Sequence, residues 1–231
     1  MSQINKNLFI FFKSILSISF RDIKIQFRNM SYIYSIMIFF IMIILIFIFA
    51  IGPDEEQLKV YLIPILWSIL ILCSCISINN LLKDDYLDGN FGIYQFTGIS
   101  FELIAISKIF TSWILYQLPI LILMPFIAFI IEINETKIFH LIITIAIGSP
   151  ILTVFTLISS AMMLTNSKNL ILGSIIMIPL CIPVIIFSIG AITNDQELFT
   201  AQINILLSIF FASLAIGPWV ISGCIKIALK N

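Results

Sequence analysis

Long apolar stretches broken by short polar turns dominate the amino-acid sequence. Six of these stretches approach the roughly 20 residues that a helix needs to cross about 30 Å of hydrocarbon. They cover residues 31–51, 61–81, 109–131, 138–164, 170–192 and 201–225. Most are separated by short polar turns, at 52–60, 132–137, 165–169 and 193–200, whereas 82–108 is a longer connection of mixed character. The pattern predicts an all-α fold, a single membrane domain (residues 1–231) in which six transmembrane helices form a polytopic bundle.

Residues 5–29, ahead of the first span, have a different pattern. Polar and basic side chains recur at steps of three and four, which places them on one helical face: Lys13, Ser17, Arg21, Lys24 and Arg28. A helix that is basic on one side and apolar elsewhere is typical of a membrane interface, and four cations would be costly inside a span. We therefore predict an N-terminal interfacial amphipathic helix with Arg21, Lys24 and Arg28 on its basic face. A first transmembrane span is the alternative.

The distribution of lysine and arginine predicts the orientation. If the N-terminus is cytoplasmic, ten cations fall on the inner side: Lys6, Lys13, Arg21, Lys24, Arg28, Lys83, Lys108, Lys168, Lys226 and Lys230. Only Lys59 and Lys137 then fall outside. Cytoplasmic loops of membrane proteins carry such an excess of cations. An even number of spans returns the C-terminus to the side of the N-terminus. We therefore expect both termini to be cytoplasmic.

Composition supports a membrane protein and excludes several other classes. Hydrophobic residues make up 61% of the 231 residues and charged residues only 10%, against about 25% charged in soluble domains. The formal net charge is zero, which argues against nucleic acid as a partner. The four cysteines have no metal or redox spacing, and we expect buried thiols. No cleavable signal peptide is expected either, because Lys13 interrupts the first apolar run.

The predicted spans contain no chemistry of their own. No Asp, Glu, Lys or Arg lies well inside any of them, which argues against a proton-coupled carrier or an ion pump. Motifs for hydrolysis or phosphate binding are missing, so we predict no catalytic residues, no metal site and no nucleotide site. The single histidine, His140, falls near the outer end of the fourth span. It is either an amphipathic end group or a ligand, for instance to haem iron.

The connection at 82–108 has the most informative pattern. Asp84, Asp85 and Asp88 cluster on the side that otherwise favours cations, and Gly89 permits a helix end or a sharp turn. Apolar and aromatic residues follow: Phe91, Ile93, Tyr94 and Phe96. Exposed aromatic side chains beside acids suit a partner-docking surface. We predict docking there, with Phe91 and Tyr94 as apolar anchors, and a helix lying against lipid as the alternative.

Several pieces of the sequence, taken in order, resemble one known family. They are RDIKIQFRN at 21–29, IGPDE at 51–55, KDDYLDG at 83–89, QLPILILMP at 117–125, IGSP at 147–150 and MIPLCIPVIIF at 177–187. Together they resemble the haem exporter protein B family, the cytochrome c maturation permeases of the ABC-2 type. The chain departs from the family pattern at 92–94 and 97–100, within the predicted docking segment.

The resemblance implies a permease subunit that works with a separate cytoplasmic ATPase, where ATP is bound and hydrolysed. It also implies a haem-handling membrane subunit and a small single-span subunit as partners, with haem delivered outside and the loaded haem chaperone released. Residues 82–108, with Asp84, Asp85, Asp88, Gly89, Phe91 and Tyr94, would then be the ATPase-coupling segment. The resemblance places the chain in a bacterial inner membrane, or in a mitochondrial inner membrane if it is organelle-encoded.

Haem chemistry favours a mechanical role for this subunit. Haem has two propionates and an iron that needs axial ligands, whereas the chain offers one histidine and no intramembrane cation. We expect no cofactor bound by this chain, with haem as a possible substrate and lipid as the surrounding solvent. Two alternatives are an ABC-2 permease for a lipid or drug-like molecule, and a structural assembly subunit without transport.

Overall fold

The computed structural model describes residues 2–28, 30–52, 55–77, 82–164, 170–193 and 196–230. Within these ranges the chain forms ten α-helices and one π-helical turn, and no strand. In chain order they are α1 (Ser2–Arg28), α2 (Ser31–Ile51), α3 (Glu55–Ser77), α4 (Lys83–Leu87), α5 (Asn90–Phe96), α6 (Phe101–Ser112), η1 (Trp113–Gln117), α7 (Leu118–Ile130), α8 (Glu135–Met162), α9 (Leu170–Thr193) and α10 (Gln196–Ala228). The predicted all-α fold is confirmed.

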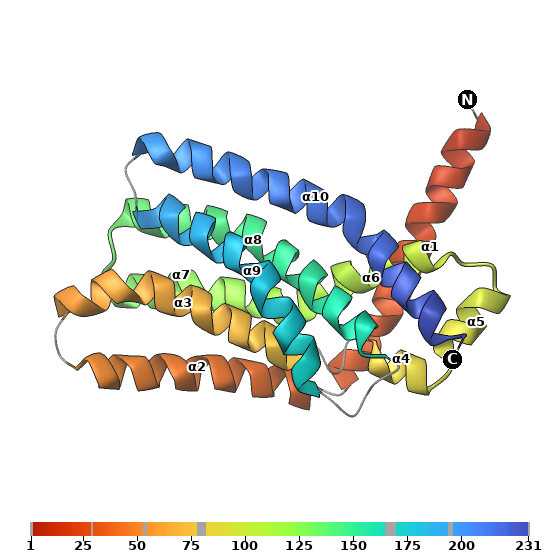
Figure 1. Ribbon diagram of the computed structural model, residues 1–231, viewed down its shortest axis with the longest axis horizontal. Coiled ribbons are helices and arrows are strands. Elements are labelled where there is room, and N and C mark those ends of the chain that lie inside the picture. The colour runs from red at the N-terminus through yellow and green to blue at the C-terminus, as the bar shows by residue number, and fades with distance from the viewer. Residues whose placement is uncertain are drawn as a thin grey trace.

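Six helical segments are long and apolar enough to cross a membrane: α2, α3, α6 to α7 taken together, α8, α9 and α10. They run alongside one another, while α1 crosses one end of the bundle (Figure 1). The short helices α4 and α5 lie at that same end, as do both termini (Figure 1). One end of the molecule therefore gathers the segments that the cation pattern assigns to one side of a membrane.

Several helices extend past the predicted spans. The second span begins at Glu55 rather than 61, the fourth at Glu135 rather than 138, and the sixth covers Gln196–Ala228 rather than 201–225. The polar residues assigned to turns form the first helical turns instead, because a helix does not end where its apolar face ends. The predicted turn at 165–169 lies outside the described residues, as do residues 78–81 and part of each of the predicted turns at 52–60 and 193–200.

The third span differs most from its predicted bounds of 109–131. Its helix begins at Phe101, where the Ser100 hydroxyl accepts a hydrogen bond from the Leu103 N–H at 3.4 Å, so 101–108 is not part of a loop. The span widens into the π turn at Trp113–Gln117, just before Pro119, whose missing N–H leaves a carbonyl of the preceding turn free. Lys108 is therefore part of a span helix, contrary to the expectation that charged residues lie only in the connections.

Close helix crossings define the centre of the bundle. A Cβ atom added at Gly148 of α8 would lie 2.5 Å from the Trp67 ring of α3. One added at Gly217 of α10 would lie 2.4 Å from Val154 of α8. Trp67 and Val154 are both fully buried. Small residues at crossings let membrane helices approach closely, which makes α8 the central packing element.

Candidate functional site

The α4–α5 segment (residues 83–96) folds as two short helices joined by a tight turn. Gly89 lies in the turn with φ +71°, a left-handed conformation that favours glycine, so the predicted turn at this residue is confirmed. A second glycine in the same region of conformational space, Gly98 (φ +75°), connects α5 to α6. The segment thus contains one glycine turn and is followed by another, and its side chains contact α1 and α6.

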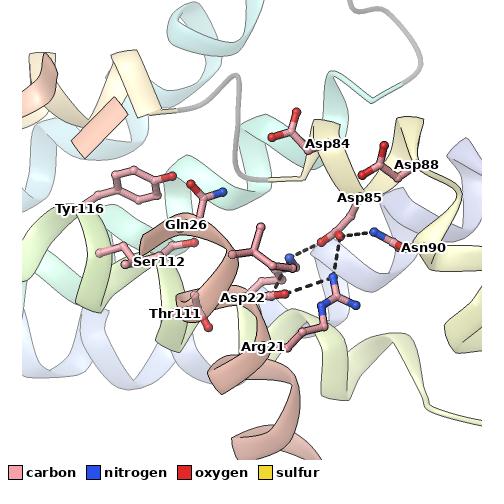
Figure 2. A pocket seen from close by; sticks show the side chains of 13 residues that line it. Arg21, Asp22, Gln26, Asp84, Asp85, Asp88, Asn90, Thr111, Ser112 and Tyr116 are labelled. Atoms are coloured by element: carbon pink, nitrogen blue, oxygen red, sulfur yellow. Dashed lines mark hydrogen bonds and ion pairs between the residues drawn. The ribbon is translucent and has the colours of Figure 1, made fainter. Parts of the chain in front are cut away.

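A polar pocket of about 90 Å³ lies where α1, α4 and the α6–η1 helix meet (Figure 2). Four carboxylates line it, those of Asp22, Asp84, Asp85 and Asp88, together with two cations, Arg21 and Lys108. The Thr111 hydroxyl also faces the pocket, is buried, and has no hydrogen-bond partner among the described residues. Residues as far apart in the sequence as Arg21 and Thr111 therefore contribute to one charged site.

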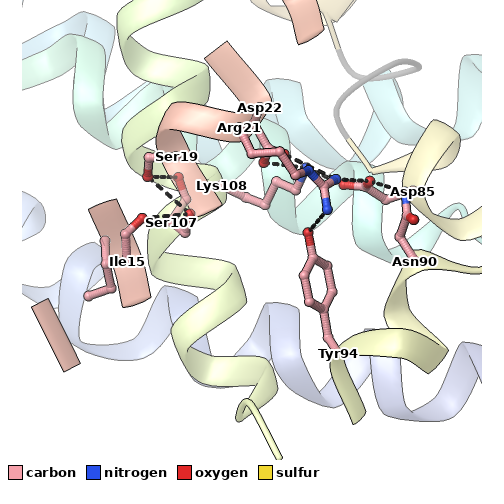
Figure 3. Close-up of polar contacts among 9 residues, drawn as sticks. All are labelled: Ile15, Ser19, Arg21, Asp22, Asp85, Asn90, Tyr94, Ser107 and Lys108. Atoms are coloured by element: carbon pink, nitrogen blue, oxygen red, sulfur yellow. Dashed lines mark hydrogen bonds and ion pairs between the residues drawn. The ribbon is translucent and has the colours of Figure 1, made fainter. Parts of the chain in front are cut away.

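Lys108 is the centre of an ion-pair network in this site (Figure 3). Its Nζ lies 2.7 Å from Asp22 Oδ2 and also contacts Asp85 Oδ2. Arg21 Nη2 lies 3.0 Å from Asp85 Oδ1 and 3.2 Å from Asp22 Oδ1. The side chains of Lys108, Asp22 and Asp85 are only 9%, 6% and 10% exposed. Two cations and two anions balance each other, which is what burial of charge requires.

Two residues of α5 take part in hydrogen bonds that complete the network. Asn90 Nδ2 donates to Asp85 Oδ1 at 2.8 Å, and Arg21 Nη1 donates to the Tyr94 hydroxyl. Burial alone would raise the pKa of Asp85, but the Lys108 charge, hydrogen bonds from Lys108 and Asn90, and the Arg21 guanidinium outweigh it and lower that pKa below its ordinary value. Burial raises the pKa of Tyr94 to about 12, so its hydroxyl stays protonated at neutral pH.

The structure corrects three predicted features of the docking surface. Phe91 is fully buried and Tyr94 is 7% exposed, so neither is available as an exposed anchor. They are three residues apart on one face of α5 and both point into the molecule. Asp85 is also buried, with its carboxylate paired inside the chain rather than free for a partner.

Other side chains of the α4–α5 segment are exposed instead. Leu87, Ile93 and Phe96 are 68%, 59% and 95% exposed. Asp84 and Asp88 are exposed acids on the same segment, and neither has an ion-pair partner among the described residues. We call these five residues the α4–α5 patch. It combines apolar and acidic groups as predicted, but on different apolar side chains.

The predicted basic face of α1 is divided between two environments. Lys24 and Arg28 are exposed, as expected. Arg21 instead points toward α4 and α5, where it pairs with Asp85 and lies 5.4 Å from the centre of the Tyr94 ring. The predicted basic face thus extends from the exposed Lys24 and Arg28 to Arg21, which buried carboxylates attract toward α4.

Sequence reasoning missed the roles of Asp22 and Lys108. Asp22 is the only acid among the first 30 residues, next to Arg21, which is a signal that could have been used. Lys108 looked like one more cation at a span end. Its contacts depend on how α1, α4 and α6 pack, and no local pattern encodes that.

His140 lies at the opposite end of the bundle, near the start of α8. Its ring stacks on Phe199 with centroids 3.9 Å apart and planes 19° apart. No group of three metal-ligating side chains occurs in the part of the chain that the structure describes, counting His, Cys, Asp and Glu. The stacking agrees with an amphipathic end group and does not test binding to iron.

Comparison with known proteins adds the family. The model of the CcmB protein family matches residues 13–228. The chain is 27% identical to heme exporter protein B of Haemophilus influenzae over 94% of its own length and 99% of that protein. Proteins of the same name from Bradyrhizobium diazoefficiens (26% identical, 89% and 94% covered) and Escherichia coli K12 (24%, 90% and 96%) are also similar. With its six apolar span helices and a match over nearly its whole length, the chain belongs to the CcmB protein family.

Proposed function

We propose that this chain is the permease subunit of an ABC complex for cytochrome c maturation. A separate cytoplasmic ATPase powers the complex, which delivers haem to the outer face and releases the loaded haem chaperone. Family membership and the names of the similar proteins, heme exporter protein B, support the haem-related part. A haem-handling membrane subunit and a small single-span subunit complete the complex, in a bacterial inner membrane or an organelle equivalent.

The observation that carries the proposal is the α4–α5 patch. Leu87, Ile93 and Phe96 are exposed in the chain alone and lie outside the six apolar span helices, beside the exposed acids Asp84 and Asp88. Exposed apolar groups outside the spans favour coverage by a partner. The sequence contains no phosphate-binding motif, so the energy source has to be another chain. The patch provides apolar anchors with an acidic rim, an arrangement that suits a docking site for an ATPase with a complementary basic rim.

The orientation follows from the cation count. The α4–α5 end of the bundle, which carries both termini, faces the cytoplasm in this proposal, where a soluble ATPase can reach it. The α7–α8 turn at 132–134 then faces outside. A cysteine introduced at Asn134 should react with an impermeant thiol reagent added from outside, whereas one at Thr97 should not.

The chain's part in haem delivery is mechanical. His140 is the only histidine and lies far from the charged network, and the groups of that network already neutralise one another. His140 and the nearby Lys137 offer one histidine and one cation, whereas haem has two propionates and an iron that needs axial ligands. Purified alone, this subunit should show little haem absorbance. A stoichiometric haem signal that His140→Ala abolishes would contradict the mechanical role.

Truncation of exposed apolar side chains in the α4–α5 patch tests whether the ATPase docks there. Phe96→Ala and Leu87→Ala should reduce the ATPase retained when this subunit is purified from cells, since truncating a central anchor typically costs about 2 kcal/mol of binding free energy. Phe129→Ala is the matched control, because Phe129 is 71% exposed but lies at the other end of the bundle. A c-type cytochrome stain of the same cells reports function. Unchanged retention and staining in both patch variants would contradict the proposal.

The same experiment separates the alternatives. A permease for a lipid or drug-like molecule would need ATPase docking, but c-type cytochrome content would not depend on it. A structural assembly subunit would support cytochrome content even when docking is lost. Loss of both ATPase and c-type cytochromes in Phe96→Ala is the result that the proposal predicts.

A further inference from the structure

The covalent link between the α4–α5 segment and the third span is a short turn. Residues 97–100 connect α5 to α6, and Gly98 has φ +75°, with no atom within 4 Å of the position that a Cβ would take. Thr97, Gly98 and Ser100 are exposed. The N–H groups of Thr97, Gly98 and Ile99 donate back to carbonyls of α5, whereas Ser100 accepts from the first turn of α6. The turn is therefore an ordered end of α5, and the backbone joint between the two helices lies between Ile99 and Ser100.

Side chains bridge the same elements more directly. Lys108 lies about two turns into α6 and contacts Asp85 of α4. The contact bypasses the turn and links the α4–α5 segment to the body of the third span. From Lys108 the helix continues through η1 and α7 to Ile130, so a displacement at Lys108 is passed on to a membrane-spanning element.

The interfacial helix α1 forms one unit with α6. Ser19 and Ser107 hydroxyls lie 3.0 Å apart, and the Ser107 hydroxyl donates to the Ile15 carbonyl at 3.4 Å (Figure 3). Lys108 adds its ion pair with Asp22 of α1. Polar contacts between this unit and the α4–α5 segment run through Asp85 and Tyr94. The network is therefore a polar joint between the two parts, beside the covalent turn and the apolar packing of Phe91 in the core.

We propose that the Asp85–Lys108 ion pair is the positioning contact that makes the third span follow the α4–α5 segment when an ATPase acts on that segment. The inference rests on the proposed function and goes beyond it, because docking alone does not identify the route by which motion enters the bundle. Asp85 and Lys108 touch neither nucleotide nor transported molecule. They transmit displacement because separating them costs each a buried charged partner: Asp85 would keep only Arg21 and Asn90, and Lys108 only Asp22.

A pair of double variants distinguishes transmission from charge balance. Asp85→Asn with Lys108→Met removes one acid and one base and cuts the link between α4 and α6. Arg21→Gln with Asp22→Asn also removes one acid and one base from the same network, but keeps the Asp85–Lys108 pair. Each variant is expressed in the full complex, and three quantities are measured: chain content of the membrane, ATPase co-purified per chain, and c-type cytochrome per chain.

The first double variant should retain the ATPase but lose cytochrome c maturation by about fivefold or more, the size of a typical coupling between sites. The second should keep maturation within about twofold of wild type. Equal effects of the two doubles, or normal maturation in the first, would overturn the inference. Failure of the wild-type chain to retain the ATPase would instead contradict the proposed function, and the inference with it.

A second experiment does not require the Asp85→Asn, Lys108→Met double variant to accumulate in the membrane. One glycine inserted after Gly98 lengthens the covalent link without touching the network, and exposed turns tolerate such insertions. If the ion pair carries the motion, maturation should stay within about twofold of wild type because loop lengthening costs little. A fivefold loss with normal ATPase retention would show that the turn carries the motion, which would overturn the inference.

Discussion

Two lysines in span helices show how differently the chain treats charge. Lys108 of α6 is buried between carboxylates of α1 and α4, and its side chain is 9% exposed. Lys226 of α10 is 50% exposed and pairs with Glu102 at 2.7 Å, which also accepts a hydrogen bond from Ser222. Both pairs lie at the α4–α5 end of the bundle. Surrounding protein shields the Lys108 pairs from water, whereas the Lys226–Glu102 pair stays in contact with water.

That difference determines what each pair can do. An exposed ion pair is exchanged readily for water and contributes little to stability. A buried pair has no such substitute, so its two partners must move together. The chain thus places its only buried lysine among the described residues at the joint between α1, the α4–α5 segment and the third span.

The largest expected effect tests this comparison directly. Lys108→Met leaves Asp22 and Asp85 buried with only Arg21 to balance them, and should lower the free energy of unfolding by about 3–5 kcal/mol. Lys226→Met should cost less than about 1 kcal/mol, because Glu102 can be hydrated. Thermal unfolding of each purified variant in detergent measures both. Similar losses in the two variants would mean that burial does not distinguish the pairs.

An apolar crossing extends the comparison to a site without charge. Gly148→Ala places a methyl group against the Trp67 ring, and overpacking of this kind typically costs about 1–3 kcal/mol. Gly223→Ala in α10 is the control, since no atom lies within 4 Å of the added Cβ. The variants are compared by their unfolding midpoints. Equal stability would show that α3 and α8 do not cross as closely as described.

A smaller effect is expected from the edge of the network. Tyr94→Phe removes the hydroxyl that accepts from Arg21 but keeps the ring beneath the guanidinium, and should cost about 1 kcal/mol because water can reach the partly exposed Arg21. Tyr86→Phe, which removes a 3.2 Å hydrogen bond to the Ala228 carbonyl, is a matched loss of one hydroxyl. If Tyr86→Phe lowers the free energy of unfolding more than Tyr94→Phe does, the hydrogen bond between Arg21 and Tyr94 is not the stronger of the two.

Much of this architecture was predictable from the sequence, and the charged joint was not. The six spans follow from apolar run length, and the turn at Gly89 follows from the conformational freedom of glycine. The start of the third span was misplaced because Glu102 and Lys108 look like loop residues until their partners are known. Phe91 and Tyr94 were predicted as surface anchors, since composition does not reveal which face of a two-turn helix packs inward.

The smallest effect concerns pH. The pKa of Asp85 is lower in the folded chain than its ordinary value, so its contribution to stability is present above the unfolded pKa of about 4 and is lost as pH falls from there through the folded value. Unfolding midpoints should therefore vary little, as far as Asp85 is concerned, between neutral pH and about pH 5. The difference in midpoint between wild type and Asp85→Asn should shrink only below about pH 4. A difference that disappears already near pH 6 would place another group in control.

Photocrosslinking from the α4–α5 patch tests the central claim, that an ATPase docks there, most directly. A photoreactive phenylalanine analogue replaces Phe96 in one variant and Phe129 in another, and both are illuminated in intact cells that contain the whole complex. Phe96 is 95% exposed on α5, whereas Phe129 lies at the far end of the bundle. The account predicts a crosslinked product of this chain with the ATPase from position 96 and none from position 129. A product from position 129 alone, or none from position 96, would contradict it.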